Sequence, residues 1–250
     1  MSAEKAKPRV AFFDFASCEG CQLQIVNLEE VLLDVVGAVD IVEFREAMKE
    51  SSNDYDIAFV EGCITRESDE TRLKEIRKNA KVLVALGACA HTGCVHPLKN
   101  LKPLEEVKRI VYGDKGDLFE TYPVRPLSAV VTVDCVVPGC PIDRTEFVEV
   151  FKALLAGKKP PIPAYPVCVE CRLKENECVY TLGMTCLGPV TRAGCGARCP
   201  SNRSSCEACR GFVDNPRMNA QKEILAEHNL TVDDILRQFT MYCSYLEAQK

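Results

Sequence analysis

Cysteine carries most of the evident chemistry in this sequence. The chain has 16 cysteines in 250 residues, with only three histidines and no tryptophan. Thiolates bind iron-sulfur clusters and zinc, and paired thiols carry redox chemistry. The shortage of histidine excludes imidazole-rich sites. Because thiols stay reduced in the cytoplasm, where we expect this chain, we interpret the cysteines as metal or redox groups rather than as eight disulfides.

One group of thiols follows predicted strands in the first part of the chain. Cys18 and Cys21 come after a strand at Arg9–Phe15, and Cys89 and Cys140 also follow apolar, β-branched runs. Ligands bind at the carboxyl ends of the strands of an open α/β sheet, so we expect these four thiols to converge on one metal centre. Two simpler interpretations stay open: a redox dithiol, or small buried hydrophobic residues.

A second, denser group of thiols lies in a segment without helical or strand periodicity. Its members are Cys168, Cys171, Cys178 and Cys186, followed by Cys195, Cys199, Cys206 and Cys209. Eight thiolates make two sets of four, as iron-sulfur clusters require, and two zinc sites would use the same ligands. The simplest partition follows chain order, with interleaved sets as the alternative. Because this segment cannot build much apolar core, we expect bound metal to order it.

The remaining cysteines are expected to be mostly structural. They are Cys63, Cys94, Cys135 and Cys243. Cys63 lies in a turn at the end of a predicted strand and is the first candidate to replace a ligand of the first group, with Cys135 as a second candidate.

Four titratable residues could assist the thiols. Glu19 and Glu61 are candidates for relaying protons or tuning a reduction potential, or they are solvated surface acids. His91 and His96 are candidate hydrogen-bond donors to the ligands, or ordinary loop histidines.

The elements that must position these residues alternate between strands and helices. Strands are predicted at Arg9–Phe15, Val39–Phe44, Ile57–Val60, Val82–Leu86 and Ala129–Val133. Helices are predicted at Glu19–Val36 and Glu67–Asn79, from the cap Asp143 to Leu155, and at Glu223–Leu225 and Thr231–Leu246. This pattern indicates an α/β fold with a parallel sheet. The proline-rich linker Lys158–Pro166 divides the chain into residues 1–157 and 158–250.

Composition limits the kind of partner. The chain has 31 basic and 36 acidic residues, a formal net charge of −5, and 47% hydrophobic residues. This content supports a folded core, and the acidic balance argues against nucleic acid as the main partner. No segment approaches the roughly 20 apolar residues of a membrane span, and the start of the chain is polar. We therefore expect a cytoplasmic protein.

Several motifs together resemble the small subunit of nickel-iron hydrogenases. They are Cys18-Glu19-Gly20-Cys21, Glu61-Gly62, Gly87-Ala88-Cys89-Ala90, Pro138-Gly139-Cys140-Pro141, Cys186-Leu187-Gly188-Pro189-Val190-Thr191 and Gly194-Cys195. The likeness extends over nearly the whole chain and is closest to the cytosolic enzymes of group 3, which include sulfhydrogenase delta subunits. A single C-x-x-C motif would be weak evidence, but this ordered set is specific.

The resemblance implies a flavodoxin-like, doubly wound domain at residues 1–157 and a loop-rich iron-sulfur domain with C-terminal helices at residues 158–250. It implies three 4Fe-4S clusters. The proximal ligands would be Cys18, Cys21, Cys89 and Cys140; the distal ligands Cys168, Cys171, Cys178 and Cys186; and the medial ligands Cys195, Cys199, Cys206 and Cys209. Two departures from the family are the absence of a twin-arginine signal and Ser17, which stands where an acid is usual.

The function implied by the resemblance is electron conduction. Electrons would pass between the nickel-iron site of a large subunit and a further redox subunit that carries flavin or iron-sulfur groups. An apolar contact patch toward the large subunit is expected around Cys18 and Cys140. Alone, the chain would not split hydrogen.

Three alternatives differ from this function. A zinc-stabilised scaffold or binding module explains the second thiol group but not the first. A flavodoxin-like flavoenzyme is disfavoured because two cysteines occupy the loop where a phosphate would bind. The related subunit of respiratory complex I has adjacent tandem cysteines and one cluster, and this chain shows neither pattern.

Overall fold

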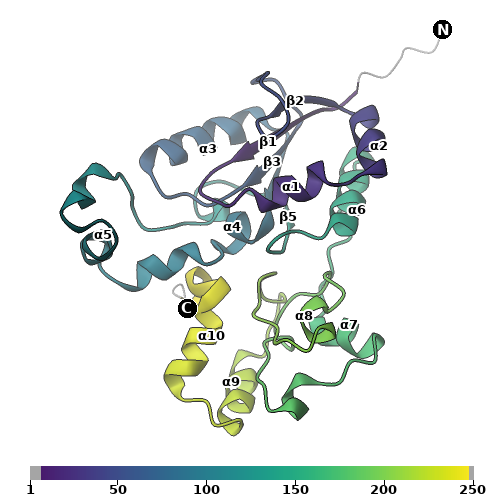
Figure 1. Cartoon of the computed structure of the whole chain (residues 1–250). Helices are drawn as coiled ribbons and strands as arrows, with labels where there is room; N and C mark the ends of the chain where they lie inside the picture. Colours follow the sequence, from purple (N-terminus) through teal and green to yellow (C-terminus); the bar gives the residue numbers. More distant parts are fainter. Residues whose placement is uncertain (1–6, 248–250) are drawn as a thin grey trace.

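The computed structural model describes residues 7–247, and a parallel sheet forms the centre of its first part (Figure 1). The polar start at residues 1–6 lies outside the described residues. The strands are β1 Arg9–Asp14, β2 Asp40–Phe44, β3 Ile57–Glu61, β4 Val82–Leu86 and β5 Cys135–Val137. They lie in the order β2-β1-β3-β4-β5, and each neighbouring pair is parallel. This is the strand order of flavodoxin-like sheets, so the predicted α/β fold is confirmed.

Helices cover both faces of the sheet. They are α1 Gly20–Val26, α2 Glu30–Ala38, α3 Glu67–Asn79, α4 Gly87–Thr92 and α6 Arg144–Leu155. Successive residues of a strand point to opposite faces. On β1, Val10 and Phe12 therefore pack with α1, α2 and α6, whereas Ala11 and Phe13 pack with α3 on the other side. The carboxyl ends of all five strands meet at one edge, where the first thiol group was expected.

The predicted cap of α6 is confirmed. The carboxylate of Asp143 accepts hydrogen bonds from the backbone N–H groups of Thr145 and Glu146, at 3.0 and 3.1 Å. These bonds satisfy two donors that the first turn of a helix leaves without intrahelical partners.

The strand predicted at Ala129–Val133 is wrong. A 3₁₀ turn occupies Leu127–Ala129, and the strand β5 begins only at Cys135. The apolar residues of the predicted strand pack against the α3 face without pairing with β4. Asp134 starts the pairing instead, because its backbone N–H donates to Leu83 O at 3.0 Å and its carboxylate accepts from Leu83 N at 2.8 Å.

The single helix predicted at Glu19–Val36 is two helices. α1 ends at Val26 and α2 begins at Glu30. Glu29 has φ 54°, which is outside the helical region, and Leu28 is buried in the core at the break. The apolar residues from which a single helix was predicted therefore belong to two helices, and Leu28 is buried between them.

An arm without a sequence prediction follows α4. It contains the 3₁₀ helices η1 His96–Leu101 and η2 Gly113–Leu118 and the helix α5 Leu104–Tyr112 between them. Figure 1 shows α5 at the side of the sheet, away from its core. No residue of α5 is buried, and Ile110 and Val111 are among its exposed apolar side chains.

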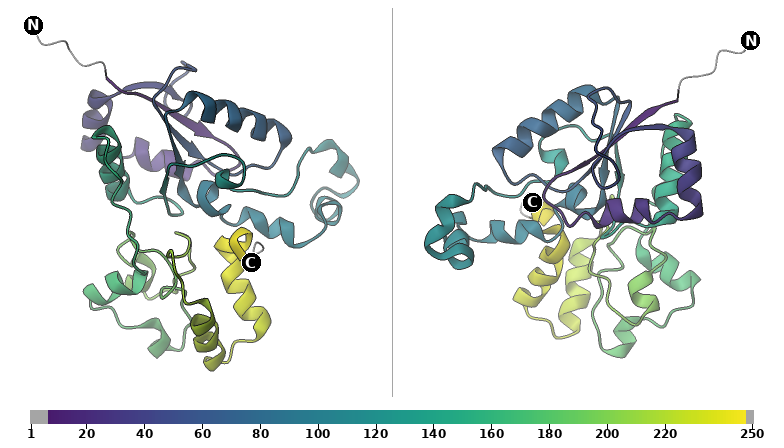
Figure 2. Two further views of the ribbon diagram at one scale, coloured as in Figure 1. Left: turned by 180° about the vertical axis from the view of Figure 1, so that it is seen from behind. Right: turned by 45° about the horizontal axis from the view of Figure 1, so that its top comes forward.

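The second part of the chain begins with short helices and loops and ends with two longer helices (Figure 2). Its elements are α7 Val167–Leu173, η4 Val179–Leu182, α8 Arg198–Ser201, α9 Met218–Glu227 and α10 Val232–Glu247. The predicted cap Thr231 is confirmed, because its hydroxyl accepts from Asp234 N at 3.2 Å. The small cores here are separate from those of the sheet. Within residues 7–247, none of the helices has the length and apolar character needed to cross a bilayer.

Candidate iron-sulfur sites

The first thiol group gathers where β1 and β4 end. Cys18 is exposed just before α1, Cys21 is buried in its first turn, and Cys89 is buried in α4. Gly87 has φ +82°, and a Cβ there would lie only 2.3 Å from Cys21 Sγ. Glycine is required for so close an approach of backbone to sulfur. Cys21 therefore lies directly against the start of the helix that carries Cys89.

The loop that carries Cys140 is attached to the same helix. The carbonyl of Gly139 accepts a hydrogen bond from Ala88 N at 2.7 Å. Burial, followed by the charge of Glu61, raises the pKa of Cys21, and the charge of Cys140 contributes in the same direction. The structure thus brings Cys140, which is exposed, to the group formed by Cys18, Cys21 and Cys89.

Glu61 is a buried group, not a solvated surface acid. Its side chain lies at the end of β3 with 1% of the residue exposed. Its two carboxylate oxygens accept from Cys21 N at 3.2 Å and Gln22 N at 3.0 Å. Burial raises the pKa of Glu61, while these hydrogen bonds oppose the rise. Glu61 therefore caps α1 from a neighbouring strand and fixes the backbone of Cys21.

A fifth thiol, Cys94, joins the first group. Its Sγ lies 3.8 Å from Cys140 Sγ, and it packs with Cys89 in a small buried cluster. The hydrogen bond with Cys140 lowers the pKa of Cys94, but the hydrogen bond with Cys89 and burial outweigh it and raise that pKa to about 12. Sequence reasoning left Cys94 among the structural cysteines. The spacing Cys89-x4-Cys94, one helical turn and a bend, was the signal that could have found it.

Metal analysis of two alanine variants tests which of the neighbouring thiols Cys94 and Cys140 is a cluster ligand. We expect Cys140→Ala to lower the iron content by about four atoms per chain, because it removes one of four cluster ligands. Cys94→Ala should leave the iron content unchanged, since the other four thiols remain. Cys243→Ala, which removes a buried thiol from the core of the second part, is the control. Iron loss in Cys94→Ala with full iron in Cys140→Ala would make Cys94 the ligand.

The two candidate replacement thiols have other neighbours. The thiol of Cys63 donates to Ala16 O at 3.3 Å and lies beside His96, whose pKa it raises through a hydrogen bond. The thiol of Cys135 donates to Val136 O at 3.8 Å on β5. Neither contact places these sulfurs among the four thiols predicted as ligands.

The first half of the second thiol group gathers around Gly188. A Cβ on Gly188 would lie 3.3 Å from Cys186 Sγ and 3.4 Å from Cys168 Sγ. Burial raises the pKa of Cys168 to about 11, and the charges of Cys186, Cys171 and Cys178 contribute in that order. The other three thiols predicted as distal ligands therefore all lie close enough to Cys168 for their charges to act on it.

The second half of this group shares a cavity with the first thiol group. The cavity has a volume of about 200 Å³, and its lining includes Cys195, Cys199, Cys206, Cys209 and Cys140. Burial raises the pKa of Cys209 to about 11, and the charges of Cys195, Cys199 and Cys140 contribute. The predicted medial set is therefore a close neighbour of Cys140, a member of the predicted proximal set.

Cys206 also touches the distal set. Its backbone N–H donates to Cys186 Sγ at 3.3 Å, and Gly188 N donates to the same sulfur at 3.4 Å. The two halves of the second thiol group are thus adjacent.

The donor chemistry fits clusters held by four cysteines. Burial raises the thiol pKa values of Cys21, Cys168 and Cys209, and a bound cation stabilises the thiolate form in which cysteine serves as a ligand. Within residues 7–247, no three His, Cys, Asp or Glu side chains converge on a point suited to a single metal ion.

His91, in the helix that carries Cys89, contacts the second part of the chain. Burial lowers the pKa of His91 to about 4, and the charges of Arg192 and Arg210 contribute. The ring packs against Gly211, where a Cβ would lie 2.9 Å from Nε2. His91 therefore belongs to the contact between the sheet and the second part of the chain.

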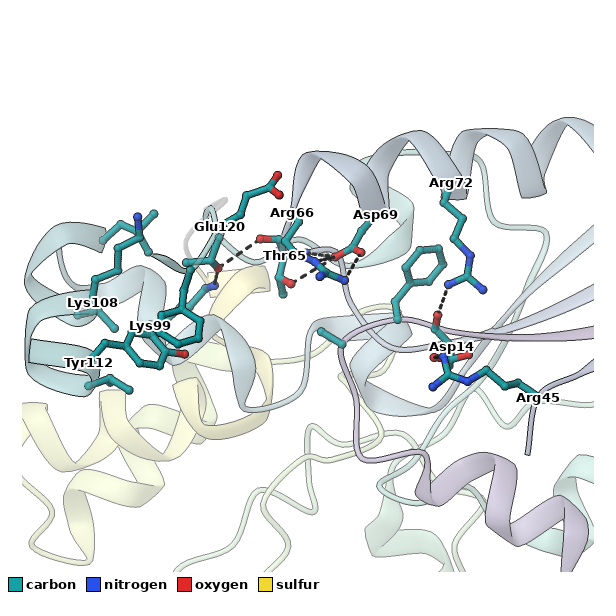
Figure 3. Close-up of a pocket in the computed structure, with 17 residues that line it drawn as sticks. Asp14, Arg45, Thr65, Arg66, Asp69, Arg72, Lys99, Lys108, Tyr112 and Glu120 are labelled. Carbon is teal, nitrogen blue, oxygen red and sulfur yellow. Dashed lines mark hydrogen bonds and ion pairs between the residues drawn. The ribbon is translucent and has the colours of Figure 1, made fainter. Parts of the chain in front are cut away.

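A larger cavity contains no thiol. It has a volume of about 620 Å³ and lies between the end of β1, α3 and the α5 arm (Figure 3). Charged side chains line it and engage one another or the backbone: Arg66 pairs with Asp69 at 2.9 Å, and Arg72 donates to Asp14 O at 2.8 Å. These groups satisfy each other, so this cavity is not the candidate site.

The fold and the thiol groups agree with the comparisons to known proteins. The family model for the NADH ubiquinone oxidoreductase 20 kDa subunit matches residues 18–154. Sulfhydrogenase 2 subunit delta of Pyrococcus furiosus is 36% identical over 228 residues, which cover 89% of this chain and 95% of the relative. The chain belongs to the nickel-iron hydrogenase small-subunit family. It is thus a subunit of group 3 hydrogenases, which are oxidoreductases.

Further relatives of this small subunit are hydrogenase chains. A vhu hydrogenase subunit of Methanocaldococcus jannaschii is 34% identical over 238 residues, which cover 82% of each chain. A chain of an NAD+-reducing nickel-iron hydrogenase structure superposes with a TM-score of 0.58 at 26% identity, covering 63% of this chain and 96% of that one. These matches do not favour the zinc-scaffold alternative, and a hydrogenase small subunit implies a large-subunit partner.

Proposed function

We propose that this small subunit conducts electrons through three 4Fe-4S clusters, between a nickel-iron large subunit and a further redox subunit. The proposal is supported by contacts between cysteines of different proposed sets: Cys140 lies in the wall of the cavity that the proposed medial cysteines line, and Cys206 N donates to Cys186 Sγ. Such adjacency is what stepwise electron transfer requires.

The proposed ligands follow the order of the chain. The proximal set is Cys18, Cys21, Cys89 and Cys140; the distal set is Cys168, Cys171, Cys178 and Cys186; and the medial set is Cys195, Cys199, Cys206 and Cys209. Each cluster, when bound, supplies a one-electron carrier.

The residues of this chain hold the clusters and set their potentials. N–H groups of Gly188 and Cys206 point at Cys186 Sγ, which stabilises negative charge on that sulfur. Such hydrogen bonds favour the reduced state and raise the reduction potential. Glu61 accepts a hydrogen bond from the backbone N–H of Cys21, and its carboxylate also interacts with the Cys21 thiol, whose pKa is raised by burial and by this interaction.

We place the large subunit on the face where the first thiol group reaches the surface. Cys18 and Cys140 are its exposed members, and Leu23 on α1 is an exposed apolar residue five positions after Cys18. The lining of the cavity in Figure 3 includes Phe15 and Ala16, just before Cys18, and Val111 of the α5 arm. The many reduced thiols suit a cytoplasmic location, which is part of this proposal.

Elemental analysis tests the proposal. Protein purified without oxygen, with its large subunit, should contain about twelve iron and twelve sulfide atoms bound by the small subunit, from three four-iron sites. The iron of the large subunit is subtracted by analysing that subunit alone. The complex should reduce a dye with hydrogen. About two zinc atoms with little iron or sulfide, in protein never exposed to air, would instead support the zinc scaffold.

A further inference from the structure

Arg210 is the largest side chain that is fully buried in the described part of the chain. It follows Cys209 directly, and 1% of the residue is exposed. Its Nε donates to Ala193 O at 2.9 Å and to Arg192 O at 3.3 Å. One edge of the guanidinium is therefore attached to the segment that leads into Cys195.

The other edge of the guanidinium reaches the sheet. Nη1 donates to Pro138 O at 2.9 Å, two residues before Cys140. Nη2 pairs with Glu146 Oε1 on α6 at 2.6 Å, and both side chains are buried. A single charged group thus connects the loop of a proximal ligand to the segments of two medial ligands.

Gly194 provides the space for this ion pair. It has φ +116°, and a Cβ there would lie 2.2 Å from Arg210 Nη2 and 2.3 Å from Glu146 Oε1. Any other residue would displace the pair, so the Gly194-Cys195 motif is explained by the packing of the arginine as well as by the ligand.

The guanidinium also faces the place where the two thiol sets meet. Arg210 lines the cavity of about 200 Å³ together with Cys140, Cys195 and Cys209. Glu146 does not line it. A charge in such a buried position acts over longer distances than one in water. Arg210 is therefore the cationic member of the pair that faces both sets.

We infer that Arg210 is a positioning residue for electron transfer between the proximal and medial clusters: it fixes their separation and supplies a buried positive charge to both. The inference rests on the proposed function. Each transfer oxidises one cluster by one electron and reduces its neighbour by one electron. A positive charge near both favours their reduced states, while the rigid contact keeps the distance between them constant.

Two charge-removing substitutions should shift the potentials in opposite directions. Arg210→Met removes the positive charge and should lower the reduction potentials of the proximal and medial clusters. Glu146→Gln keeps an oxygen acceptor for Nη2 but removes the opposing negative charge, so it should raise the same potentials. The distal cluster should change less in both variants. A residue with only a structural role gives no reason for shifts of opposite sign.

The test is a redox titration of the anaerobic complex, followed by electron paramagnetic resonance, with iron content measured first. Arg210→Met should also change the magnetic interaction between the reduced proximal and medial clusters. Hydrogen-dependent dye reduction should fall by about 10- to 100-fold, the range for groups that orient ligands. The controls are Arg144→Met and Glu149→Gln, the same changes at solvent-exposed ion pairs on α6; both should leave the potentials unchanged.

Potentials and magnetic interaction equal to those of the unmodified complex, or shifts of the same sign in both variants, would overturn the inference. If Arg210→Met does not retain its iron, the sign of the shift in Glu146→Gln decides. Failure of the proposed function has a different signature, because the unmodified complex would then lack two interacting clusters.

Discussion

Removal of iron from the small subunit is expected to unfold residues 167–210 while the five-stranded sheet stays folded. One of the two small cores to which that segment contributes is partly made of the ligands themselves, since Cys186 and Cys206 pack with Val167, Val179 and Ala197. Metal binding contributes about 10–16 kcal/mol in small zinc domains, as much as the whole stability of an ordinary domain. The sheet has an aliphatic and aromatic core on both faces and does not depend on metal.

Hydrogen exchange measured by mass spectrometry checks this expectation. After anaerobic chelation, the amides of residues 167–210 should exchange fully, and those of β1 and β3 should keep their protection. Reconstitution with iron and sulfide is the control and should restore protection to the second part of the chain. Unchanged protection of residues 167–210 without iron would show that apolar packing alone orders the segment.

The central sheet could be predicted because its strands are buried on both faces. Strands such as β3 and β4 are continuous apolar runs, so they are legible without any tertiary information. The position of the first thiol group followed from the same pattern, because parallel strands present their carboxyl ends at one edge. The predicted strand at Ala129–Val133 failed because apolar side chains can pack on a helix without pairing, and the pairing depends on Asp134.

The environment of the thiols could not be predicted to the same depth. Cys94 meets Cys140 only because α4 ends and the chain reverses at Gly93, a contact across 46 residues. The same limit applies to Arg210, whose partners Pro138 and Glu146 belong to the other part of the chain. The sequence shows which residue types are present and how far apart they lie along the chain. The neighbours of Cys94 and Arg210 depend instead on how separate segments pack.

Substitution of Glu61 by alanine is the mutation expected to have the largest effect on stability. The carboxylate is buried and accepts two backbone N–H groups from the first turn of α1. Each hydrogen bond to a charged group contributes about 1.5–3 kcal/mol, so the loss should be about 3–6 kcal/mol. For a chain of this size that lowers the melting temperature by roughly 6–24 °C.

Calorimetry of the anaerobic complex measures the melting temperature, and elemental analysis measures the iron content. Glu75→Ala, at an exposed position on α3, is the matched control and should leave both unchanged. Glu61→Gln should lie between Glu61→Ala and the native protein, because an amide oxygen can accept only one of the two bonds and the amide nitrogen opposes the other. The iron loss should be confined to the proximal set, since Cys21 N is one of the two donors. A melting temperature of Glu61→Ala equal to that of Glu75→Ala would show that α1 holds Cys21 in place without its cap.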